Sequence, residues 1–128
     1  MTARNSAVVL CVAAEQLSLS IRGLVLQSEG YQVISASTFE DALRLAVERH
    51  PDVIVCEQPF GKGSGIALAK GLKELNPNTP ILLITGLTEA APQTLAVDAY
   101  MTKIDGPQAF LKNVAALLER SRSGTHAA

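Results

Sequence analysis

Three residues of this chain could do chemistry on a charged group, and each stands where an apolar run ends. Glu57 closes one run, Thr85 closes a second, and Lys103 follows a third. A carboxylate can act as a nucleophile in phosphoryl transfer, a reaction in which Mg²⁺ neutralises the charge spread over the phosphoryl oxygens. Because Mg²⁺ needs oxygen ligands, phosphoryl transfer at Glu57 depends on whether residues near it in space carry such oxygens.

The apolar runs alternate with amphipathic segments, which is typical of an α/β fold. Continuous apolar strands between helices predict a parallel sheet that is covered on both faces. The right-handed crossover rule favours a three-layer, doubly wound, five-stranded sheet of flavodoxin-like order 2-1-3-4-5. The expected strands are residues 7–12, 32–36, 53–57, 81–85 and 97–102, and the main helices are expected to begin near residues 15, 39, 64 and 105.

This topology brings the candidate residues together. The carboxyl ends of parallel strands form one edge of the sheet, where ligands bind in open α/β folds. That edge should carry Glu57, Thr85 and Lys103, together with the pair Ala13-Ala14 that follows the first strand.

The ordered set of acid, hydroxyl and ammonium group resembles the response-regulator receiver domain, the CheY-like family. The resemblance runs from about Ala7 to Glu119. Further matches are Gly30-Tyr31, Pro51-Asp52, Gly65, Thr79-Pro80 and the run from Tyr100 to Lys103. Each match is weak alone, whereas their order along the chain is specific. The resemblance implies a cytoplasmic domain of two-component signal transduction and phosphorelay.

The resemblance also shows where this chain departs from the family. The family has a phosphoacceptor Asp at the position of Glu57, and an acidic pair that holds Mg²⁺ at the positions of Ala13 and Ala14. Alanine side chains offer Mg²⁺ no oxygen. Glu57 is one methylene longer than Asp, and a misplacement of roughly 1 Å can cost on the order of 10²-fold in rate. We therefore expect an atypical, degenerate receiver without Mg²⁺, cofactor or phosphotransfer.

The other site residues each allow two interpretations. The family's Lys contacts the phosphorylated acid, so Lys103 could form a standing ion pair with Glu57 that imitates the active state. Alternatively, Glu57 is a tolerated relic, solvated at the sheet edge. Thr85 and Tyr100 match the family's switch pair, and Thr85 could hydrogen-bond Glu57. Alternatively, Thr85 only ends a strand and Tyr100 packs half-buried without switching.

The interval between the fourth and fifth strands departs from the family as well. Thr85 and Lys103 lie closer together in the sequence than in typical receivers. Residues 87–94 include Pro92 and show little amphipathic pattern. We expect the fourth helix of the family to be short, distorted or absent.

Apolar residues are spread around the first predicted helix. At about 100° per residue, Leu19 lies far from Leu17, Ile21 and Leu24. Whichever side is buried, at least one leucine should face outward. Scattered exposed leucines are common on monomers, so the sequence leaves two alternatives: an ordinary surface, or a surface for a protein partner or a homodimer.

Composition and charge argue against several other classes. The 128 residues carry a net charge of −1 and 4% aromatic residues, so binding to nucleic acid or to a membrane surface is not indicated. No apolar run approaches the length of a membrane span. Cys11 and Cys56 lie inside apolar runs and predict two buried free thiols in a reducing cytoplasm. One domain is expected over residues 1–120, with residues 121–128 as a flexible tail or the start of a linker.

These patterns predict a binding module and not an enzyme. The expected function is that of an atypical receiver domain that binds protein partners in signalling independently of phosphorylation. One alternative keeps phosphorylation, through a non-standard site. Another, from a different class, is a small flavodoxin-like enzyme or cofactor carrier. Against it, the predicted strand ends carry no Ser/His/acid or Cys/His set.

Overall fold

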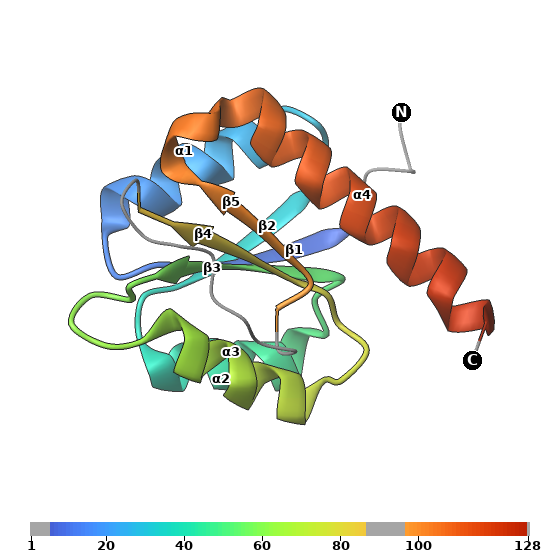
Figure 1. Ribbon diagram of the computed structural model, residues 1–128, viewed down its shortest axis with the longest axis horizontal. Helices are drawn as coiled ribbons and strands as arrows, with labels where there is room; N and C mark the ends of the chain where they lie inside the picture. The colour runs from blue at the N-terminus through green and yellow to red at the C-terminus, as the bar shows by residue number, and fades with distance from the viewer. Residues whose placement is uncertain (1–5, 87–96, 128) are drawn as a thin grey trace.

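Five parallel strands form one sheet in this chain (Figure 1). The computed structural model describes residues 6–86 and 97–127, without the side chains of residues 122–127. The strand order β2-β1-β3-β4-β5 confirms the predicted flavodoxin-like arrangement. The strands are β1 (Val8–Val12), β2 (Gln32–Ala36), β3 (Val53–Gln58), β4 (Ile81–Thr85) and β5 (Ala99–Thr102).

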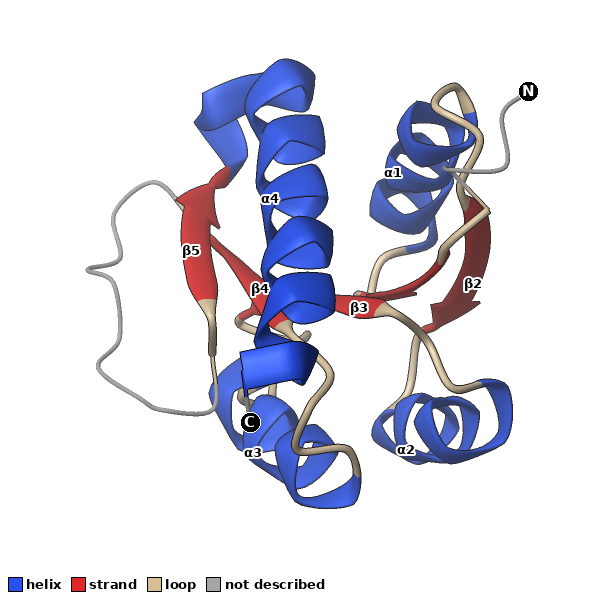
Figure 2. Cartoon of the chain, turned by 90° about the vertical axis from the view of Figure 1, so that its right-hand side faces the viewer, coloured by secondary structure: helices blue, strands red, loops and turns tan. Residues whose placement is uncertain are grey.

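Helices cover both faces of the sheet, so that the sheet and two helix layers form the predicted three-layer architecture (Figure 2). Helices α1 and α4 lie on one face, and α2 and α3 lie on the other. Their bounds are α1 (Gln16–Gln27), α2 (Phe39–Arg49), α3 (Gly65–Leu75) and α4 (Gly106–Ala127).

The side chains of each central strand alternate between two apolar cores. Val53 and Val55 of β3 face α1 and α4, whereas Ile54 and Cys56 face α2 and α3. Because both faces of β3 are buried, its sequence is a continuous run of apolar residues up to Cys56. The next residue in the alternation, Glu57, therefore points toward the layer formed by α1 and α4.

Short polar side chains begin two of the helices. Thr38 Oγ1 accepts a hydrogen bond from the Asp41 amide at the start of α2, and Ser64 Oγ accepts one from the Ala67 amide at the start of α3, both at 3.1 Å. Each cap satisfies an amide that has no partner inside the helix, which stabilises the helix by about 1 kcal/mol. These helix starts fix the loops that follow β2 and β3.

The last helix is longer than the sequence predicts. It has Pro107 in its first turn and continues through Ala127. The backbone of the expected tail, residues 121–128, is therefore mostly helical. No proline interrupts this stretch, and adding residues to an existing helix is far easier than starting one. The domain bounds 1–120 remain a prediction.

Two expectations concern other parts of the chain. The predicted short or absent helix at residues 87–94 lies outside the described residues. In the part that the structure does describe, no helix has both the length and the apolar character needed to cross a bilayer.

Candidate functional site

The carboxyl edge of the sheet carries the residues that the sequence singled out. Glu57 lies opposite Ile84, and Thr85 lies opposite Thr102, so β3, β4 and β5 end at nearly the same level. A single 3₁₀ turn, η2 (Lys103–Asp105), follows β5 and begins with Lys103. The parallel register therefore brings Glu57, Thr85 and Lys103 to one edge, although they are far apart in sequence.

Glu57 is a buried acid held between two cations. Its Oε2 atom lies 2.7 Å from Arg22 Nη2 and 3.6 Å from Lys103 Nζ. The side chains of Glu57 and Arg22 are 6% and 14% exposed, while that of Lys103 is 48% exposed. Glu57 is therefore not a solvated residue at the sheet edge, and Arg22 is its nearer and more buried partner.

The contact between Arg22 and Glu57 is ionic rather than a directed hydrogen bond. Glu57 Oε2 is buried and has no hydrogen bond of good alignment within the described residues. A buried carboxylate is costly unless opposite charge compensates it. The guanidinium group of Arg22 supplies most of that compensation, because it is closer than the ammonium group of Lys103 and more shielded from water.

Arg22 is the site residue that the sequence analysis missed. It lies in α1 on the same side as Leu19 and Leu26, which are both buried. The spacing of these three residues (i, i+3, i+7) is that of a core-facing helical stripe. A charged residue within such a stripe needs a buried partner, and this signal could have identified Arg22.

Thr85 is buried at the same edge, but its hydroxyl group has a different partner from the one considered. Thr85 Oγ1 donates a hydrogen bond to the carbonyl oxygen of Met101 in β5 at 3.4 Å. This bond ties β4 to β5 near their carboxyl ends. Tyr100, on the neighbouring strand, is half-buried and packs against the core formed with α2 and α3. The two residues of the expected switch pair thus lie on adjacent strands.

The end of β1 offers no side-chain ligand for Mg²⁺. Ala13 is buried and Ala14 is exposed, and neither side chain has an oxygen atom. The next acid, Glu15, is exposed and accepts a hydrogen bond from Ser18 Oγ at 3.4 Å. Among the described residues, no group of three His, Cys, Asp or Glu side chains could hold a metal ion. With Arg22 against the carboxylate of Glu57, the residues present do not fit a magnesium site.

The start of α3 is held close to Glu57 by the side chain of Gln58, the last residue of β3, and by a glycine. Gln58 Oε1 accepts hydrogen bonds from the amides of Gly65 at 2.6 Å and Ile66 at 3.1 Å. A Cβ atom at Gly65 would lie 2.0 Å from the carbonyl oxygen of Glu57, which is closer than any side-chain carbon can approach an oxygen atom. Gly65 therefore allows α3 to begin directly against the backbone of the site.

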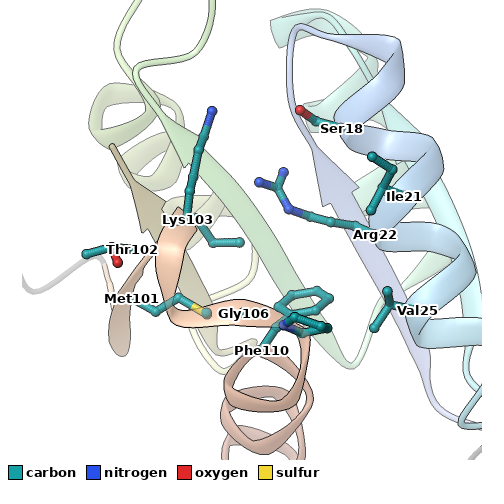
Figure 3. A pocket seen from close by; sticks show the side chains of 11 residues that line it. Ser18, Ile21, Arg22, Val25, Met101, Thr102, Lys103, Gly106 and Phe110 are labelled. Carbon is teal, nitrogen blue, oxygen red and sulfur yellow. The ribbon is translucent and has the colours of Figure 1, made fainter. Parts of the chain in front are cut away.

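A groove lies next to the ion pairs, between α1 and the start of α4 (Figure 3). Its volume is about 280 Å³. Arg22 and Lys103 line it, and in Figure 3 their side chains extend from opposite walls. Most other lining side chains are apolar, among them Ile21, Val25 and Phe110.

The two cysteines are structural. Cys11 faces the core with α1 and α4, whereas Cys56 faces the core with α2 and α3, so the sheet separates the two free thiols. Burial raises the pKa of each thiol from 9.0 to about 12. The negative charge of Glu57 adds to the rise of the pKa of Cys56. Both thiols are therefore protonated and unreactive near neutral pH, as the sequence predicted.

Comparison with known proteins gives a consistent picture. Residues 9–106 match the family model described as response regulator receiver domain. The chain is 34% identical over 117 residues to the alkaline phosphatase synthesis transcriptional regulatory protein PhoP of Bacillus subtilis, covering 88% of this chain and 49% of that protein. It is 33% identical over 117 residues to the transcriptional regulatory protein KdpE of Mycobacterium tuberculosis, covering 88% and 51%. The chain thus spans about half the length of these curated relatives.

Solved structures share the fold. A CheY-like response regulator receiver domain protein from Methanospirillum hungatei gives a TM-score of 0.81 at 20% identity, covering 92% of this chain and 98% of that one. A response regulator receiver domain protein from Clostridium thermocellum gives a TM-score of 0.82 at 22% identity, covering 91% and 97%. At these identities the likeness concerns the fold alone.

Proposed function

Because this chain belongs to the response regulator receiver domain family, we propose that it is a signalling module that binds its protein partner without being phosphorylated. The contact of 2.7 Å between Arg22 and Glu57 carries this proposal. It places a permanent positive charge of the protein against the acid that stands at the family's phosphoacceptor position.

The chemistry of the site supports a constitutive role. Phosphoryl transfer needs an accessible nucleophile and a metal ion that neutralises the phosphoryl oxygens. The carboxylate of Glu57 is 6% exposed and is neutralised by Arg22. Ala13 and Ala14 add no oxygen ligand. In this proposal the carboxylate already has its counterion, and no phosphoryl group is added to it.

Lys103 has a secondary role in this proposal. Its ammonium group lies 3.6 Å from Glu57 and is half exposed, so it adds a weaker attraction from the side of β5. Arg22 and Lys103 together connect α1, β3 and the turn after β5 through one carboxylate. We propose that this three-way connection fixes the surface around the site in one state, which a partner recognises.

The relatives suggest the setting of this module. PhoP and KdpE are described as transcriptional regulatory proteins, and this chain matches about half of each. We propose that the chain likewise regulates a partner or an adjoining domain through protein contacts. In this proposal it has no catalytic activity of its own.

Amide NMR spectra recorded during addition of Mg²⁺ and then of beryllofluoride, a phosphoryl mimic, test the proposed function. The resonances near Glu57, Thr85 and Lys103 should stay in place. A receiver domain that carries the acidic pair serves as the positive control for the reagents. If the resonances of this chain shift together and saturate, a metal and a phosphoryl group can enter the site, and the proposal is wrong.

A further inference from the structure

Another partly buried ion pair lies at the amino edge of the sheet, opposite to the edge that carries Glu57. Lys73 Nζ of α3 is 2.7 Å from Asp98 Oδ2, and the two side chains are 20% and 24% exposed. Asp98 stands directly before β5. The pair therefore joins a helix on one face of the sheet to the beginning of its last strand.

Asp98 also takes part in the pairing of the strands. Its Oδ2 atom accepts a hydrogen bond from the Ile81 amide at 2.8 Å, while its own amide donates one to the Ile81 carbonyl oxygen at 2.9 Å. Lys73 Nζ donates in addition to the carbonyl oxygen of Thr79 at 2.8 Å. Because Ile81 begins β4 and Asp98 precedes β5, these contacts fix the start of one strand against the start of the next.

The strand that follows has few other contacts that specify its register. β5 is four residues long and is the last strand of the sheet, paired among the described strands with β4 alone (Figure 2). Met101 is its one buried residue. At the far end the Thr85 hydroxyl adds a long hydrogen bond of 3.4 Å to the Met101 carbonyl oxygen. A strand that buries few side chains specifies its register weakly, and a slip by one residue turns every side chain to the other face.

Lys103 depends on the register of β5. It follows β5 directly, and its Nζ atom is 3.6 Å from Glu57 Oε2. A slip by one residue moves the backbone by about 3.3 Å and would break this contact. We propose that Lys73 and Asp98 are positioning residues, which set the register of β5 and thereby keep Lys103 in contact with Glu57. The role of that contact rests on the proposed function, whereas its geometry can be tested alone.

NMR spectroscopy of the whole chain tests this positioning. Asp98→Ala removes the acceptor of both the Lys73 ammonium group and the Ile81 amide. The resonances of Lys103 should therefore shift, and hydrogen exchange of the β5 amides should become about tenfold faster. Asp98→Asn keeps an oxygen for the Ile81 amide, so its effects should be smaller. Lys73→Met removes only the cation and should also accelerate exchange in β5.

Thr38→Ala is the matched control. It removes the cap of α2 and so destabilises the domain through a different helix. If Asp98 and Lys73 served stability alone, their variants would behave like this control: exchange would rise in all strands through global unfolding, and the resonances of Lys103 would stay in place. Positioning predicts instead that the changes are concentrated in β5 and at Lys103.

Nuclear Overhauser contacts between β4 and β5 report the register directly. In the wild type they should place Ile84 beside Met101. In Asp98→Ala these contacts should weaken or move by one residue. A variant that keeps them, together with the Lys103 resonances of the control, overturns the proposal. If Asp98→Ala does not fold, Lys73→Met and Asp98→Asn decide by the same measurements. These spectra need neither Mg²⁺ nor a phosphoryl mimic, so a failure here is distinct from a failure of the proposed function.

Discussion

Arg22, in the middle of α1, reaches across to the end of β3 and brings its guanidinium nitrogen Nη2 to 2.7 Å from the carboxylate of Glu57. This pair lies at the carboxyl edge of the sheet, close to Lys103. It connects a helix that covers one face of the sheet to the central strand. The contribution of this pair to stability, and the parts of it that come from charge and from packing, can be measured separately.

Replacing Arg22 by Met should destabilise the domain. The substitution keeps much of the side-chain volume but leaves the carboxylate of Glu57 buried without its nearer partner. Breaking a buried ion pair in this way lowers the free energy of unfolding by about 3–5 kcal/mol. We expect a loss near ~3 kcal/mol, because the Arg22 side chain is 14% exposed and water screens part of the attraction. Urea unfolding measures the loss.

The double variant Arg22→Met/Glu57→Gln separates charge from packing. If the uncompensated charge causes the loss, removing the carboxylate should restore most of the stability, and the two single effects should not add. Simple additivity of the two substitutions would show that Arg22 acts only through its packing. Arg22→Lys is the conservative control and should lose less than Arg22→Met.

Replacing Lys103 by Ala should have a much smaller effect. The ammonium group is 3.6 Å from Glu57 and 48% exposed, so water screens the attraction. The expected loss of unfolding free energy is about 0–1 kcal/mol. The measurement is a double-mutant cycle on Lys103 and Glu57. A coupling as large as that between Arg22 and Glu57 would contradict the order of importance of the two cations.

Two glycine substitutions should change stability in opposite directions. At Gly65 a Cβ atom would meet the backbone oxygen of Glu57 at 2.0 Å, so Gly65→Ala must move α3 or β3 and should cost about 3 kcal/mol or more. At Gly23, inside α1, the nearest atom to a Cβ is Val33 Cγ1 at 3.8 Å, an ordinary contact. Gly23→Ala should therefore stabilise the domain by about 0.5–1 kcal/mol. Thermal unfolding of both variants checks the two signs.

The buried thiols predict a loss of stability at alkaline pH. In the unfolded chain Cys11 and Cys56 ionise around pH 9.0, whereas burial raises their pKa to about 12 in the folded chain. Above pH 9 the unfolded chain releases protons that the folded chain keeps, so the free energy of unfolding falls as pH rises toward 12. Between pH 9 and pH 12 each thiol lowers the free energy of unfolding by up to about 1.4 kcal/mol per pH unit. Below pH 9 the thiols cause no such loss.

The comparison is between the wild type and Cys11→Ala/Cys56→Ala, unfolded in urea at neutral pH and at about pH 10. The double variant should lose less stability between the two conditions than the wild type does. Equal losses would show that other groups, and not the thiols, cause the alkaline decline. Native-state alkylation should be slow for the same reason, and it should become fast on unfolding.

The sheet could be predicted because its signals are local. Continuous apolar runs, helix caps such as Thr38 and Ser64, and the turn glycine Gly30 each depend on near neighbours in the sequence. Strand order then followed from general rules of connection. For the same reason Glu57, Thr85 and Lys103 could be placed at one edge before any coordinates were known.

The partner of Glu57 could not be predicted with the same ease. The resemblance points to Lys103 as one possible partner, because the family's Lys contacts the phosphorylated acid, whereas Arg22 lies in mid-helix, where a charged residue usually faces water. Whether a long side chain reaches the sheet depends on how closely the helix packs, which no local pattern reports. The position of Arg22 on the stripe of Leu19 and Leu26 was the available clue. The length of α4 has a different cause, since polar residues do not by themselves stop a helix.

Glu57 also sets the net charge of the groove between α1 and α4. Two cations, Arg22 and Lys103, line that groove, and they lie 2.7 Å and 3.6 Å from the carboxylate of Glu57. A neutral residue at position 57 would leave the two positive charges side by side without their shared counterion. An acid that does not line the groove therefore determines how strongly the groove attracts anions.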